Sequence, residues 1–146
     1  MKTATLTAPN ILLVDDNHNG LVVRKLLLQE AGFQVQVADC GEEALDLISS
    51  SRFDIVVTDY RMPRMNGGEL IVQIRANYPD ARIILLSGFV EPLGLTEENT
   101  GADAVIAKSA TEASHLLRSV RRLLHTPSRR KPPARQTAAT ARRSQA

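Results

Sequence analysis

The stretch DIVVTDYRMPRMNG, residues 54–67, joins a mostly apolar run to a turn through a single aspartate. Residues 54–58 are rich in β-branched side chains, which is typical of a parallel strand covered on both faces. Asp59 follows directly, and Pro63 and Gly67 then favour a turn that leads into a helix. An aspartate at this place can simply cap the helix. It can also present its carboxylate for chemistry at the end of the strand.

Four other stretches of the chain have the character of strands, and segments with helical periodicity separate them. They are NILLV, FQVQVA, RIILLS and DAVIA, at residues 10–14, 33–38, 82–87 and 103–107. FQVQVA alternates apolar and polar residues and suits an edge strand, whereas the others are nearly continuous apolar runs. Strand and helix alternate five times, which predicts right-handed crossovers and an α/β fold, a doubly wound five-stranded parallel sheet.

Apolar residues at helical spacing predict the inner faces of the helices. The predicted stripes are Val22, Leu26 and Leu27; Ala44, Leu45 and Ile48; Leu70, Ile71 and Ile74; and Ala113, Leu116, Leu117, Val120, Leu123 and Leu124. Gly32 ends the first helix, and SATE (109–112) is a capping-box pattern at the start of the last one. Pro92 and Gly94 interrupt the stretch 88–101, so we expect a fourth helix that is short, broken or late-starting.

Length and charge divide the chain into a body and a tail. A chain of 146 residues fits one domain, which we expect at residues 10–125, after a flexible arm at 1–9. Residues 126–146 contain six basic residues and no acidic one. They show no apolar period, which predicts a disordered basic tail. The remainder has 12 basic and 16 acidic residues, a formal charge of −4.

The composition argues against several classes of protein. No apolar stretch approaches the roughly 18 residues that span a bilayer, and the first residues lack the apolar region of a signal peptide. The single cysteine, Cys40, cannot form an internal disulfide, which fits a reducing cytoplasm. Three scattered histidines and one cysteine argue against a zinc site. We therefore expect a cytoplasmic protein with no membrane span.

The residues at the predicted carboxyl ends of the strands are those suited to chemistry, because ligands bind beyond these ends in an open parallel sheet. The first strand ends in Asp15 and Asp16, the third in Asp59, the fourth in Ser87 and the fifth in Lys108. Each has a plain structural reading alone: a helix cap, a loop hydroxyl or a solvated surface lysine. Together they would bring three carboxylates, a hydroxyl and an ammonium to one rim.

Such a set of groups predicts phosphoryl chemistry with a metal ion. Three close carboxylates raise one another's pKa values unless a cation neutralises them. Mg²⁺ takes oxygen ligands and leaves positions open for water or phosphate. A carboxylate beside it can attack a phosphoryl group to give an aspartyl phosphate. The ammonium of Lys108 would add charge neutralisation, and the hydroxyl of Ser87 can hydrogen-bond a phosphoryl oxygen.

Four motifs in register resemble the receiver domain of response regulators in bacterial two-component systems. They are LLVDDN (12–17), DIVVTDYRMPRMNG (54–67), ILLSG (84–88) and GADAVIAK (101–108). The resemblance covers about residues 10–125. It implies a flavodoxin-like (βα)5 receiver fold with strand order 2-1-3-4-5.

The resemblance also implies a role for each residue at the strand ends. Asp59 would be the phosphoacceptor, Ser87 the switch hydroxyl and Lys108 the lysine that binds phosphate. The Mg²⁺ site would consist of Asp15, Asp16, Asp59 and the backbone carbonyl of Arg61. Within it, Asp15 would act mainly through water.

Two positions depart from the family pattern. Val105 stands where the family usually has an aromatic residue that swings inward on activation. Ser109 follows Lys108 where the family usually has proline, often in a cis peptide bond. Neither change affects the phosphorylation chemistry, but both concern the usual route of signal relay.

The resemblance implies a stand-alone receiver, a signalling protein rather than an enzyme. It would accept phosphate from a sensor histidine kinase or a phosphotransfer protein and act on an unknown output protein. The tail, of about 20 residues, is too short for a DNA-binding winged helix or helix-turn-helix.

Three other functions are alternatives to a stand-alone receiver. The tail could give a nucleic-acid-associated regulator weak, non-specific affinity, or the protein could be a phosphorylation-independent scaffold. A hydrolase with an aspartyl nucleophile usually has a second aspartate two residues later, where this chain has Arg61.

Overall fold

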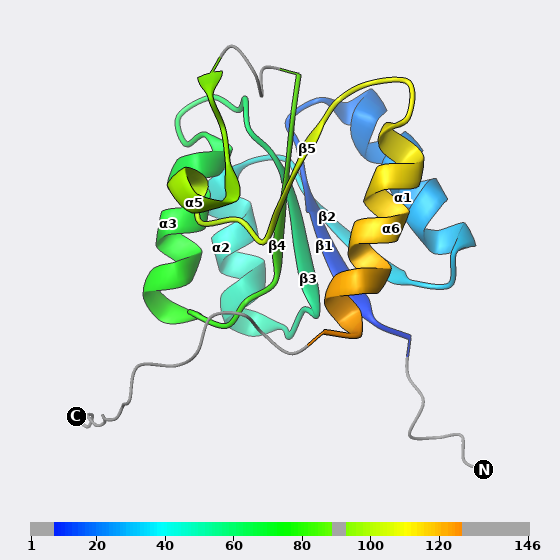
Figure 1. The fold of residues 1–146 in the computed structure, drawn as a ribbon. Helices are drawn as coiled ribbons and strands as arrows, with labels where there is room; N and C mark the ends of the chain where they lie inside the picture. The colour runs from blue at the N-terminus through cyan, green and yellow to red at the C-terminus, as the bar shows by residue number, and fades with distance from the viewer. Residues whose placement is uncertain (1–7, 89–92, 127–146) are drawn as a thin grey trace.

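A parallel sheet of five strands with helices on both faces makes up the fold (Figure 1). The computed structural model describes residues 8–88 and 93–126. With the strands numbered along the chain, their order in the sheet is 2-1-3-4-5, as the family resemblance implied. The expected basic tail from residue 127 on, and residues 1–7 of the expected arm, lie outside the described residues.

The helices and strands follow one another in the predicted alternation. In chain order they are β1 (Asn10–Val14), α1 (His18–Glu30), β2 (Gln34–Ala38), α2 (Gly41–Ser50), β3 (Ile55–Asp59), α3 (Gly67–Asn77), β4 (Ile83–Ser87), α5 (Glu97–Thr100), β5 (Ala104–Ala107) and α6 (Glu112–Leu124). Every strand begins and ends within one residue of its predicted bounds. Within the described ranges, no helix is both long and apolar enough to cross a membrane.

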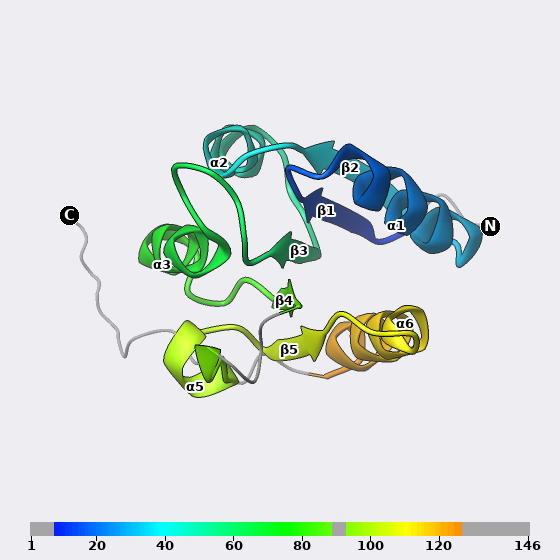
Figure 2. The same ribbon diagram turned by 90° about the horizontal axis from the view of Figure 1, so that it is seen from above.

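The sheet separates two apolar cores, because successive side chains of a strand point to opposite faces. In β1, Ile11 and Leu13 face the core that α1 and α6 cover, whereas Leu12 faces the core under α2 and α3 (Figure 2). β2 lies at the edge of the sheet, as its alternating sequence predicted, and its residues Gln34 and Gln36 are exposed.

The inner face of α1 differs from the prediction. Leu21, Arg24 and Leu28 are its buried residues, whereas Val22 and Leu26 are 44% and 54% exposed. The predicted stripe was wrong for Val22 and Leu26. A charged residue occupies the middle of the buried face, so the apolar residues around it gave the wrong helical phase.

The start of α6 also differs from the prediction. Further along, α6 buries Leu116, Val120 and Leu123, as expected. Ala113, predicted to be inside, is exposed. The capping box predicted at 109–112 does not form: the N-cap of α6 is Thr111, the hydroxyl of Ser109 accepts from the N–H of Thr111 at 3.2 Å, and Glu112 binds Arg24.

The connection between β4 and β5 contains a helix of one turn. α5 lies at the end of the stretch 88–101, which agrees with the expectation of a short, broken or late-starting helix. Gly94 precedes it with a φ of +64°, and residues 89–92 lie outside the described residues. The N–H of Val105 in β5 donates to Oε2 of Glu97 at 3.3 Å, which ties this turn to the sheet.

Candidate functional site

Three carboxylates meet at the carboxyl ends of β1 and β3. One oxygen of each of Asp15, Asp16 and Asp59 lies within 4.8 Å of the others. Asp15 and Asp59 are 2% and 5% exposed, whereas Asp16 is exposed to solvent. The structure thus brings together the three acidic residues that the sequence placed at the strand ends.

The pairing of the strands positions these residues. In β1 and β3, Val14 pairs with Thr58, so that Asp15 and Asp59 follow at the same level of the sheet. The N–H of Asp15 donates to the carbonyl of Ala38 at 3.1 Å, which continues the ladder one residue beyond β1. The hydrogen bonds of the sheet therefore hold the backbone that carries the carboxylates of Asp15 and Asp59.

A helix cap accounts for Asn17 but not for the acidic pair. The side chain of Asn17 accepts a hydrogen bond from the N–H of Gly20 at 3.2 Å and is the N-cap of α1. Neither Asp15 nor Asp16 has this role. The plain structural reading of the acidic pair was therefore wrong.

The turn after Asp59 returns the chain tightly to α3. The N–H of Gly67 donates to the carbonyl of Tyr60 at 2.7 Å. A Cβ atom at Gly67 would overlap the carbonyl oxygen of Asp59, so only glycine fits. Asn66 and Glu69 then form a capping box that begins α3. This turn holds the end of β3 in place.

Lys108 and Ser87 complete the rim. The ammonium of Lys108 forms an ion pair with Oδ1 of Asp59. The N–H of Lys108 donates to the carbonyl of Ser87 at 3.0 Å, which joins the ends of β4 and β5. Ser87 is 1% exposed. The lysine is thus paired with the buried aspartate rather than being a solvated surface residue.

The surroundings of Asp59 act in opposite directions on its pKa. Burial raises the pKa of the carboxyl, and the charge of Asp15 raises it further. The hydrogen bond and charge of Lys108, and the charge of Arg24, lower it, but the pKa remains raised overall. An ionised Asp59 is therefore costly in the protein alone, and a further cation at the site would stabilise it.

Arg24 belongs to the site and was missed by the sequence reasoning. Its Nη1 donates to Oδ2 of Asp15 at 2.9 Å, and its Nε donates to Oε2 of Glu112 at 2.6 Å. Burial lowers the pKa of the guanidinium, but the bonds and charges of Glu112 and Asp15 outweigh burial and raise it. The signal that could have revealed it is a lone charge within the apolar spacing of the first helix.

The three carboxylates at the rim fit a hard divalent cation, because they offer oxygen ligands and an excess of negative charge. Both oxygens of Asp15 already have partners, since Oδ1 accepts from the N–H of Asn17 at 2.9 Å and Oδ2 accepts from Arg24. Asp16 lies on the open side of the cluster. With Arg61 it lines a surface depression of about 420 Å³.

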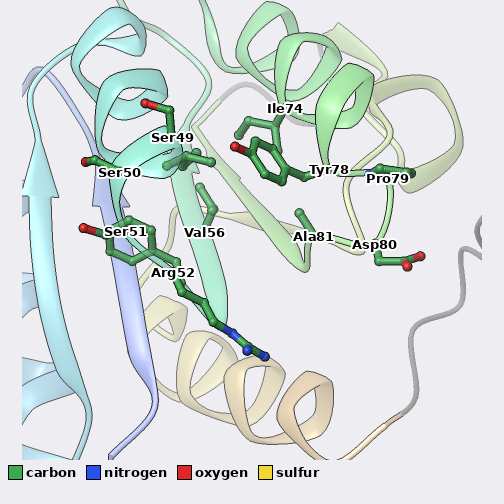
Figure 3. A pocket seen from close by; sticks show the side chains of 12 residues that line it. Ser49, Ser50, Ser51, Arg52, Val56, Ile74, Tyr78, Pro79, Asp80 and Ala81 are labelled. Carbon is green, nitrogen blue, oxygen red and sulfur yellow. The ribbon is translucent and has the colours of Figure 1, made fainter. Parts of the chain in front are cut away.

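A larger cavity, of about 720 Å³, lies away from these groups (Figure 3). Residues before β3 and β4 line it, among them Arg52, Tyr78 and Asp80. It is therefore at the amino ends of the strands, the opposite edge of the sheet from the carboxylates.

Both positions that depart from the family pattern lie within the described residues. Val105 is half-buried and packs against the core on the α2 and α3 face. All peptide bonds of the described residues are trans, including the bond between Lys108 and Ser109.

Known proteins match nearly the whole body of the chain. Residues 11–121 match the family model of the response regulator receiver domain. The C4-dicarboxylate transport transcriptional regulatory protein DctD of Rhizobium meliloti is 35% identical over 116 residues, which are 79% of this chain and 25% of DctD. Response regulator MprA of Mycolicibacterium vanbaalenii is 42% identical over 77 residues, 53% of this chain and 33% of MprA. The chain thus spans about a third or less of these relatives.

Solved structures of receiver proteins match the same region. Response regulator TrrA of Thermotoga maritima, in complex with Mg(2+)-BeF, is 35% identical with a TM-score of 0.72, over 79% of this chain and 98% of TrrA. TrrA has also been solved in complex with the histidine kinase ThkA. Chemotaxis response regulator CheY4 of Vibrio cholerae is 30% identical with a TM-score of 0.73, over 80% of this chain and 99% of CheY4. Together with the strand order and the acidic residues at the strand ends, these matches show that the chain belongs to the response regulator receiver domain family of two-component signalling.

Proposed function

We propose that this receiver accepts a phosphoryl group on Asp59 from a sensor histidine kinase or a phosphotransfer protein. The observation that carries the proposal is the setting of Asp59 at the end of β3. It is 5% exposed, is ion-paired with Lys108 and lies in a cluster with two other carboxylates. The similarity to TrrA, which has been solved with Mg(2+)-BeF and with a histidine kinase, supports it.

Each residue of the rim would have a separate role in phosphoryl transfer. Mg²⁺, held by Asp16, Asp59 and the backbone carbonyl of Arg61, with Asp15 acting through water, would neutralise charge on the entering group. Lys108 holds one oxygen of Asp59 and supplies a second positive charge. The hydroxyl of Ser87, at the end of the neighbouring strand, would donate to a phosphoryl oxygen.

The transfer exchanges one bond to phosphorus for another. A carboxylate oxygen of Asp59 attacks the phosphorus of a phosphohistidine, and a P–O bond forms while the P–N bond breaks. The electron pair of the broken bond goes to the imidazole, which takes up a proton from solvent. The modified receiver then acts by contact with an output protein, so the transfer is a signalling step and not the turnover of a substrate.

We infer that the protein acts in the cytoplasm, which the free thiol of Cys40 fits. Signalling through phosphorylation of Asp59 remains our proposal. The alternative, a scaffold that works without phosphorylation, is separated from it by the following experiment.

Acetyl phosphate with Mg²⁺ should add one phosphoryl group to the protein, as measured by intact mass. Asp59→Asn should abolish the added mass, because the amide is not a nucleophile, and EDTA should suppress it. Asp80→Asn is the matched control, since Asp80 is an exposed acid at the opposite edge of the sheet. Undiminished labelling of Asp59→Asn would refute the site, and a folded wild-type protein that takes no label would favour the scaffold.

A further inference from the structure

We propose that Arg24 is a positioning residue of the acidic site, which holds Asp15 in place and weakens the binding of a divalent cation there. Glu112 moderates this effect by sharing the guanidinium. The inference rests on the proposed function, because it concerns the affinity of the same carboxylates for Mg²⁺. The inference goes beyond the proposed function because it assigns roles to the guanidinium of Arg24 in α1 and to the carboxylate of Glu112 in α6.

Arg24 occupies a position that suits an apolar side chain. It lies on the inner face of α1 between Leu21 and Leu28, and it is 9% exposed. A buried guanidinium loses its hydration, and well-packed apolar side chains of similar volume are often at least as stable. Packing alone therefore does not account for an arginine at this position. The two carboxylates that it binds account for it.

The two partners come from distant parts of the chain. Asp15, at the end of β1, accepts from Nη1 at 2.9 Å, and Glu112, in the first turn of α6, accepts from Nε at 2.6 Å. The planar guanidinium suits such a bridge, because its donors point in fixed directions. A Cβ atom at Gly20 would lie 2.8 Å from Nη1 and 3.1 Å from Oδ2 of Asp15, so glycine leaves room for the pair.

This bridge sets the charge that a cation meets at the rim. The guanidinium already compensates Asp15, so a divalent cation is attracted less than three free carboxylates would attract it. Glu112 draws part of the same positive charge away from Asp15. Removing the charge of Arg24 should therefore tighten Mg²⁺ binding, whereas removing the charge of Glu112 should weaken it.

The opposite signs distinguish this role from a merely structural one. We would measure the Mg²⁺ affinity of the unphosphorylated full-length chain by calorimetric titration. Arg24→Met should bind Mg²⁺ about three- to tenfold more tightly than wild type. Glu112→Gln should bind it about two- to threefold more weakly. Arg24→Lys keeps the positive charge but lacks the planar guanidinium that bonds both carboxylates. Its Mg²⁺ affinity should therefore stay within about twofold of wild type, while its melting temperature falls.

Arg75→Met is the matched control. Arg75 is also largely buried, with 15% of its side chain exposed, and it pairs with Asp103 at 3.0 Å. It also donates to the carbonyls of Pro79 and Gly101 in the loops that precede β4 and β5, at the edge of the sheet opposite the rim. This variant should lose stability and keep the Mg²⁺ affinity of the wild type.

Three outcomes would overturn the inference. Weaker binding in both Arg24→Met and Glu112→Gln would mean that the bridge only maintains the fold. Unchanged affinity in both, with normal binding by the wild type, would refute the charge effect and leave the proposed function standing. A wild-type protein that binds no Mg²⁺ would overturn the proposed function and the inference together. If Arg24→Met does not fold, Arg24→Lys decides, because a merely structural bridge would weaken its Mg²⁺ binding, whereas the charge effect keeps its affinity within about twofold of wild type.

Discussion

At the scale of single residues, Asp59 is a carboxyl group whose ionisation works against the folded state. Its pKa is raised, chiefly by burial. Below the pKa of an unfolded aspartate, about 3.9, both states are protonated and the group has no effect on stability. As the pH rises through the raised pKa of the folded state, the unfolded chain releases its proton more readily, and the free energy of unfolding falls.

Asp59→Asn should therefore stabilise the metal-free protein near neutral pH. In EDTA at pH 7 we expect its melting temperature to lie roughly 3–6 °C above that of the wild type. The difference should shrink as the pH falls towards about 4, because the wild-type carboxyl then becomes protonated. Thermal melts followed by circular dichroism across this range would measure it. An asparagine variant less stable than wild type at pH 7 would show that the Lys108 ion pair outweighs the cost of burial.

The residues at the rim could be predicted because each directly follows an apolar strand. Asp15, Asp59 and Lys108 are informative as a set, and the parallel sheet brings their side chains together. Arg24 could not be found in this way. Its role depends on Glu112, which lies 88 residues further along the chain, and no local pattern pairs the two.

At the scale of helices and strands, the prediction succeeded where burial alone decides the structure. Four strands are nearly continuous apolar runs and β2 alternates apolar and polar residues, and both patterns predicted the strand bounds within one residue. The errors were in α1 and at the start of α6, where side chains form long-range bonds. Arg24 displaced the apparent apolar stripe, and Glu112 was drawn from the predicted capping box to Arg24. Periodicity and local capping rules do not include such competition.

The single turn of α5 should carry most of the conformational response to phosphorylation. α5 has four residues, three of them exposed, so it opens more readily than β5, which the sheet holds. Val105 also provides no aromatic ring to swing inward. On addition of beryllofluoride and Mg²⁺, amide NMR shifts should be larger at residues 88–101 than at 104–107. Asp59→Asn should show no such shifts, and dominant changes around Val105 would contradict the prediction.

At the scale of the whole molecule, charge separates the acidic body from the basic tail. The carbonyl of Thr126 accepts a hydrogen bond from Nη2 of Arg82 at 2.8 Å, so a truncation that preserves this contact begins at residue 127. Deleting residues 127–146 should change the melting temperature by less than about 2 °C and leave the labelling of Asp59 intact, because no core residue is lost. Melts and intact-mass labelling of the truncated protein would test this.

Any affinity of the full chain for nucleic acid should disappear with the same truncation. It should also fall steeply with salt and show no sequence preference, because its driving term would be the contact of arginines with phosphates rather than with bases. A chain of full length whose six basic tail residues are replaced by glutamine is the control for charge. Sequence-specific binding, or a truncated protein that does not fold, would contradict the assignment of a separate cationic tail.

The bridge between α1 and α6 also bears on how the protein forms while it is being made. Glu112 lies 88 residues after Arg24. At about 5–20 residues per second, the ribosome needs roughly 4–18 s to add these residues. During that interval the nascent chain holds a guanidinium that lacks one carboxylate partner, beside an apolar surface that Leu116 and Val120 of α6 will later cover. The rim of carboxylates therefore reaches its final arrangement only after Glu112 has been added to the chain.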